Sequence, residues 1–166
     1  MGKDTSQIPD AIRERIVQSV ADRLNTISSS NGYGTDPGTG WMRRVTLDPN
    51  PVAFSDAATG FVYREDEQIA DRALNMLECT LTIVVEVYVS SDGDGIDSEV
   101  DGYLSDVEQA VMVDPTWSNL ATQTFLRSTY VETPGEGENV VRGQVRIEVQ
   151  YQRDRAPPIL LGSSGD

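Results

Sequence analysis

The chain has 166 residues, which fits one domain, and 38% of them are apolar, which is enough for one hydrophobic core. It has no run of about 18 apolar residues and no apolar stretch near its start, so we expect neither a membrane span nor a secretory signal. The lack of histidine and the net charge of −14 disfavour histidine-based catalysis, zinc sites and binding of nucleic acid through a basic patch.

The first predicted element is a helix close to the N-terminus. Residues 1–7 are polar, and we expect a disordered N-terminus there, followed by a single domain over residues 8–153. Behind Pro9, apolar residues recur every three or four positions, with charged residues between them. This spacing predicts an amphipathic helix of about five turns that lies on a sheet. Its apolar stripe consists of Ile12, Ile16, Val17, Val20, Ala21, Leu24 and Ile27.

Two segments after this helix have little periodicity. Residues 28–40 read SSSNGYGTDPGTG and are typical of a loop. They lack the Gly-Lys-Ser/Thr ending of a phosphate-binding loop, so we expect no nucleotide there. Trp41–Leu47 alternates and predicts a strand, whereas residues 52–72 favour a loop or arm with at most a short strand at Phe61–Tyr63.

Two long alternating segments carry the strongest pattern in the chain. Every odd position of Leu77–Val89 is apolar, and Val141–Tyr151 repeats the pattern. A period of two predicts strands with one face toward the core and one toward solvent, as in an antiparallel sheet covered on one side. Thirteen residues span roughly 43 Å, so we expect a bulge or a projecting end. Cys79 lies on the apolar face and is interpreted as a buried structural thiol.

A second helix and a hairpin complete the predicted domain. Asp97 or Ser98 can cap a helix whose apolar stripe is Val100, Leu104, Val107 and Val111, and Pro115 ends it. Thr122–Val131 and residues 140–152 predict a hairpin around a glycine-rich turn, and residues 154–166 a flexible C-terminal tail. The fold class is therefore α+β: an antiparallel β-sheet with two amphipathic α-helices packed on one face.

The acidic stretch Asp92–Glu99 raises the question of calcium. An EF-hand counted from Asp92 needs glycine and glutamate where this chain has Asp97 and Tyr103, so that motif fails. A looser carboxylate site stays open, and with it the alternative of a small acidic ligand- or calcium-binding module. No catalytic set, cofactor motif or defined metal site is recognisable, and we expect none, so the chain is not expected to be an enzyme.

The order of these elements resembles a known family over roughly residues 8–152. The helix IRERIVQSVADRL, the glycine-rich loop, the strand TIVVEVYV, the helix end DVEQAVMVDPTW and the strand GQVRIEVQY occur in that order. This arrangement is similar to the tail-terminator or tail-completion proteins of long-tailed bacteriophages.

The resemblance implies a virion structural protein that forms a hexameric ring. The ring would cap the tail tube, stop its polymerisation and join it to the head-tail connector protein, at the head-proximal end of the tail and, during assembly, in the host cytoplasm. Expected partners are other copies of the chain, the tail-tube protein and the connector, while DNA passes through the pore without specific binding and no membrane is involved. A connector or stopper, or the tail-tube protein itself, is the alternative within the same assembly. The acidic surface fits either plain solubility or a channel wall that repels nucleic acid.

The candidate contact segments for the ring and tube are the arm 52–72, the loop 28–40 and the edges of the long strands. Aromatic residues are enriched at binding hot spots, and arginine can contact a partner's acidic surface. Trp41 could serve as an interface anchor or belong to the core. The predicted interface residues are Trp41, Arg43, Arg44, Phe54, Tyr63 and Arg64.

Overall fold

The computed structural model describes residues 12–37, 41–43, 58–73, 75–90, 95–132 and 139–155. The expected N-terminus 1–7, Arg44, Phe54, the acidic pair Asp92 and Asp94, and the tail from residue 156 lie outside the described residues. The elements are α1 (Ile12–Leu24), a 3-10 turn (Ser29–Asn31), β1 (Trp41–Arg43), β2 (Ala58–Ala73), β3 (Met76–Ser90), α2 (Ile96–Met112), β4 (Gln123–Val131) and β5 (Val140–Asp154).

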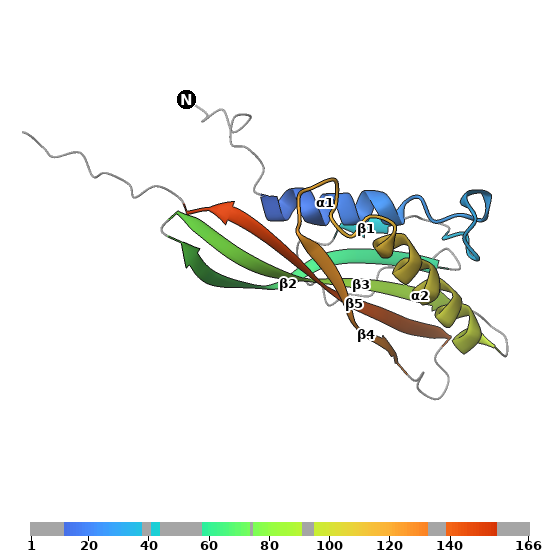
Figure 1. Cartoon of the computed structure of the whole chain (residues 1–166). Coiled ribbons are helices and arrows are strands. Elements are labelled where there is room, and N and C mark those ends of the chain that lie inside the picture. The colour runs from blue at the N-terminus through green and yellow to red at the C-terminus, as the bar shows by residue number, and fades with distance from the viewer. Residues whose placement is uncertain are drawn as a thin grey trace, which may run out of the picture.

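The strands form one sheet in the order β1-β2-β3-β5-β4 (Figure 1). All pairs from β2 to β4 are antiparallel, whereas the short β1 runs parallel to β2. Both helices pack on one face, and their apolar stripes share a core with the odd positions of β3 and β5. The predicted α+β architecture is confirmed. The strand expected from Trp41 is described for Trp41–Arg43, and its parallel pairing with β2 was not expected.

The core face follows the alternating pattern closely. Leu81, Val85 and Ile147 are at most 1% exposed, and α1 and α2 cover them with residues such as Val20 and Val107. Gly143 on β5 lets α2 approach closely, since a Cβ there would lie 2.7 Å from Val100 Cγ1 and 2.9 Å from Leu104 Cδ2. The packing of α2 on the sheet therefore depends on the missing side chain at this position.

The opposite face of the sheet is less exposed than the alternation predicts. On β3, Val84 and Glu86 point away from the helices, yet they are 0% and 3% exposed. Phe61 of β2 is 7% exposed on the same face and makes an edge-to-face contact with Tyr88, the ring centroids 5.8 Å apart. The expectation of a fully solvated face was wrong here, because long side chains of neighbouring strands cover one another.

Residues 58–72, expected in a loop or arm, form most of the 16-residue strand β2. The strand pairs with β3 along its length and has a bulge at Glu65, between Arg64 and Asp66. Beyond the bulge its residues are mostly exposed. Figure 1 shows why: this end of β2, β3 and β5 extends past the start of α1, so no helix covers its outer part. The long strands project as expected, but this bulge lies in β2, and the pairing of β3 with β5 has no register shift.

The second helix begins earlier than the sequence indicates. Gly95, with φ of 105°, precedes Ile96, so Asp97 and Ser98 lie in the first turn and neither caps the helix. Asp97 and Glu99 still favour the helix, because negative charge is stabilising at its N-terminus. At the other end of the chain, Asp154 ends β5 and the backbone N–H of Arg155 donates to Asn75 O at 2.9 Å, so the start of the predicted tail belongs to the sheet.

Candidate functional site

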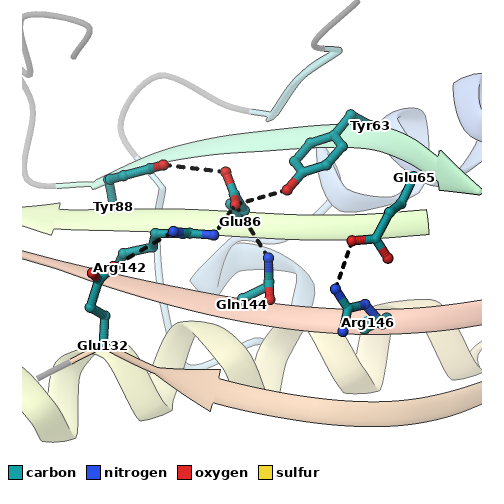
Figure 2. A network of polar contacts seen from close by, with 8 residues as sticks. All are labelled: Tyr63, Glu65, Glu86, Tyr88, Glu132, Arg142, Gln144 and Arg146. Atoms are coloured by element: carbon teal, nitrogen blue, oxygen red, sulfur yellow. Dashed lines mark hydrogen bonds and ion pairs between the residues drawn. The ribbon is translucent and has the colours of Figure 1, made fainter. Parts of the chain in front are cut away.

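The face of the sheet without helices carries a buried acidic group, Glu86, at its centre (Figure 2). Four side chains from β2, β3 and β5 donate hydrogen bonds to its carboxylate. Arg142 Nη2 lies 2.6 Å and Gln144 Nε2 3.3 Å from Oε1. The hydroxyl of Tyr63 lies 2.9 Å from Oε1, and that of Tyr88 3.2 Å from Oε2. These donors replace the water that a buried carboxylate loses, and Arg142 balances its charge.

The electrostatics of the site also fix the protonation of Tyr63. Burial and the hydrogen bond to Glu86 raise the pKa of Tyr63 from 10.0 to about 12. The phenol is therefore protonated near neutral pH, where it donates to the carboxylate. This group acts as a structural donor and not as a base at ordinary pH.

Further cross-strand ion pairs surround Glu86 on the same face. Arg146 of β5 contacts Glu65 in the β2 bulge at 2.7 Å, as Figure 2 shows. Arg142 also reaches Glu132 at 3.6 Å. Toward the β4 edge, Arg127 Nε lies 2.6 Å from Glu148, with its guanidinium 4.9 Å from the Phe125 ring centroid. The result is a face of paired charges over four strands, which suits contact with another polar protein surface more than burial in an apolar interface.

A partly buried polar group ties α1 to the projecting end of the sheet. Glu67 of β2 faces the helix side and accepts hydrogen bonds from Arg13 of α1, at 2.9 Å, and from the hydroxyl of Tyr151. Burial and the bond to Glu67 raise the pKa of Tyr151. Nearby, Arg153 Nε donates to Cys79 Sγ at 3.4 Å. Cys79 is fully buried, which confirms its interpretation as a core thiol.

The glycine-rich loop is held against α2 by one carboxylate. Asp106, 6% exposed, accepts bonds from the backbone N–H of Gly34 at 3.1 Å and of Thr35 at 2.7 Å, and from the Thr35 hydroxyl at 2.6 Å. The backbone N–H groups of Gly34 and Thr35 thus have the Asp106 carboxylate as their acceptor.

The turn after α2 has an unusual backbone. Trp117, Ser118 and Asn119 have φ of 51°, 57° and 66°, a left-handed conformation that non-glycine residues rarely adopt. Asp114 holds the turn by accepting from Thr116 and from Ser118 N–H at 2.8 Å. The buried indole of Trp117 donates to Thr124 at 2.9 Å. A hollow of about 480 Å³ separates this turn from α1; it is lined by Glu14, Arg15, Gln18, Ser19, Trp117, Ser118 and Leu120.

The structure brings one predicted interface residue, Tyr63, into the Glu86 network. Its neighbour Arg64 faces the helix side, is exposed and lies 3.5 Å from Glu14 of α1. Arg43 lies in β1, where its backbone pairs with Val62. Arg44 and Phe54 lie outside the described residues.

Trp41, predicted as an interface residue, lies instead in the core. It is 5% exposed, and a Cβ at Gly60 would lie 2.0 Å from its ring carbon Cε3. The side chain of Asn25 holds the Trp41 backbone, accepting from its N–H at 2.8 Å. The large indole fits because β2 has a glycine directly opposite, so this side chain is not available to a partner.

Sequence reasoning did not identify Glu86. The signal was one acidic residue inside the apolar segment TIVVEVYV, on the side where β5 carries Arg142 and Arg146. Only the strand register shows that these residues meet, since Glu86 pairs with Gln144.

In the part of the chain that the structure describes, no three histidine, cysteine or acidic residues are grouped to hold a metal ion. None of the described helices has the length and apolar character needed to cross a membrane.

No family model and no curated protein matches the chain. Among solved structures it is similar to a chain described as "Virion of native gene transfer agent (GTA) particle". That similarity covers 87% of this chain and 100% of the other, at 12% sequence identity and a TM-score of 0.47.

Proposed function

We propose that this protein is a structural component of a phage-like virion and acts as a tail terminator, not as an enzyme. The proposal rests on where in the fold the segments that resemble that family lie. IRERIVQSVADRL is α1, TIVVEVYV lies in β3, DVEQAVMVDPTW contains the end of α2, and GQVRIEVQY lies in β5. The resemblance in element order is thus supported by one compact arrangement of two helices on a sheet.

The proposed mechanism is steric. A hexameric ring of this chain binds the last ring of the tail tube through one surface. Its opposite surface differs, so no further tube subunit adds and the head-side connector docks instead. A heterologous contact between identical subunits closes into such a ring when the rotation between neighbours fits. Each copy carries a net charge of −14, which disfavours non-specific binding of DNA to the pore.

Electron microscopy of the purified protein, together with its mass in solution, tests this proposal. We expect rings of about 109 kDa, six times the 18.2 kDa of one chain. Long stacked tubes would instead identify the tail-tube protein, and rings that bind the connector but not tube ends would identify a connector or stopper.

The role itself is tested by assembling particles without the protein. If it terminates tails, tube length becomes uncontrolled and heads fail to join, and adding the purified protein restores both. Tails of normal length joined to heads in its absence would refute the proposal.

A further inference from the structure

The sheet has two open edges. β4 is the last strand on one side, and no described strand pairs with its outer edge. On the other side β1 pairs only with residues 60–62 of β2. Residues 63–73 pair with β3 on their inner edge, and no described strand pairs with their outer edge. Both open stretches are mostly exposed. Open strand edges present unpaired N–H and C=O groups that favour pairing with another chain.

Exposed large apolar side chains gather at these same two edges. On β4 they are Leu126, 39% exposed, and Tyr130, 55% exposed, and on the open part of β2 it is Ile69, 52% exposed. Met76, 40% exposed, begins β3 at the same projecting end. At the end of α2, Met112 is 44% exposed. It lies one turn beyond Glu108, which accepts a hydrogen bond from Thr129 of β4 at 2.6 Å, so this side of α2 runs along the β4 edge.

The two edges also differ in charge. The open part of β2 contains four acidic and two basic residues, whereas β4 contains Arg127 and no acidic residue. Two copies of the β2 edge would bring their acidic groups together, but a β2 edge against a β4 edge avoids this. Ile69 and Leu126 pair with Cys79 and Ile147, so both point to the helix side of the sheet. They could therefore meet on one face of a continued sheet.

We propose that β4 of one copy pairs with residues 63–73 of β2 in the next copy, with Ile69 beside Leu126. This inference rests on the proposed ring and names its subunit interface. The strand directions fit: β2 and β4 run antiparallel within one sheet, so rotating a copy about an axis along the strands presents an antiparallel pair. Because the two edges are different, the contact is heterologous and forms a ring when it closes.

Site-specific cross-linking tests this pairing. Ile69→Cys and Leu126→Cys are prepared separately in a full chain that also carries Cys79→Ala, because the native Cys79 pairs directly with residue 69 across β2 and β3. Each variant alone, and an equal mixture of both, is treated with a short bis-maleimide. We expect covalent dimers in the mixture, at least tenfold more than with either variant alone, because the contact joins one residue of each kind. Matched control mixtures pair each variant with Ser105→Cys, on the exposed side of α2, and should stay monomeric.

The outcomes separate this inference from the proposed function. Dimers of Leu126→Cys alone would indicate β4 against β4 and overturn the pairing. Rings in the microscope without cross-links in the mixture would overturn the interface and leave the proposed function standing. If the mixture cross-links but particles terminate their tails without this protein, the interface is supported and the proposed function is refuted. A monomer without cross-links would overturn the interface and count against the ring.

Discussion

At the scale of single residues, Glu86 is the most constrained group on the helix-free face. A buried carboxylate is costly unless hydrogen bonds and an opposite charge replace its hydration. Donors from three strands meet at this one side chain, which is 3% exposed. Glu86 therefore ties β2, β3 and β5 together on the side that no helix covers.

Replacing Glu86 by glutamine should destabilise the protein by about 2–3 kcal/mol, because the change removes the buried counter-charge of the partly buried Arg142 and leaves it only the exposed Glu132. Urea unfolding measures this. Glu132→Gln is the matched control, since Glu132 meets the same arginine at 3.6 Å but is 53% exposed, and its loss should cost less than about 0.5 kcal/mol. Equal losses in the free energy of unfolding for the two variants would show that burial of Glu86 does not strengthen its contribution to stability.

Tyr63 gives a prediction for alkaline pH. Its folded pKa is about 12, raised above the ordinary value of 10.0. The stability that it contributes is therefore complete below pH 10 and is lost as pH rises toward about 12. Tyr63→Phe should flatten the fall in the free energy of unfolding over this range. Some slope should stay, because burial also raises the pKa of Tyr103 and Tyr151. Identical pH profiles for wild type and variant would contradict the assignment.

At the scale of elements, the turn after α2 stores backbone strain that its surroundings hold in place. Three successive left-handed residues would each cost about 1–2 kcal/mol in isolation. The Asp114 carboxylate and the buried indole of Trp117 offset that cost. Bonds to Thr116 and Ser118 lower the pKa of Asp114, as expected for a carboxylate held in its charged form.

Ser118→Gly should raise the stability by about 0.5 kcal/mol, because glycine adopts a positive φ without strain but costs more entropy on folding. Ser118→Val should lower it by more than about 1 kcal/mol, since a branched side chain disfavours that backbone. Ser118 is exposed, so neither change disturbs the core. The midpoints of urea unfolding rank the three proteins, and the reverse order would show that the turn is not left-handed.

The sequence was informative where one face of an element is buried along its whole length. The core-facing positions of β3 and β5 follow the alternating rule almost end to end, and the helix stripes are equally regular. β2 could not be recognised, because the bulge at Glu65 shifts the pattern: Gly60 and Val62 face the helices before it, but Glu67 and Ile69 after it. An interrupted period in a partly uncovered strand looks like a loop.

The candidate site was predictable only in part for a related reason. Alternation places Arg142, Gln144 and Arg146 on the face away from the core, and this prediction is confirmed. Which residue they meet depends on the register between β3 and β5, which are distant in the sequence. Local patterns contain no information on that register.

At the scale of the whole molecule, charge and edge pairing oppose each other. Every copy has a net charge of −14, so neighbouring copies repel over a distance set by the salt concentration. The proposed contact adds backbone hydrogen bonds and apolar burial at short range, which salt screens much less.

Self-association should therefore strengthen when salt is added. Between about 0.01 M and 0.15 M ionic strength the screening length falls from roughly 30 Å to 8 Å, which removes most repulsion between subunits. We expect the apparent dissociation constant of the ring to fall by about tenfold or more, measured by sedimentation velocity. The double variant Asp97→Asn, Asp101→Asn removes two exposed charges from α2 and should show a weaker salt dependence. Rings that dissociate as salt rises would mean that attraction between opposite charges, and not apolar and backbone contact, holds the copies together.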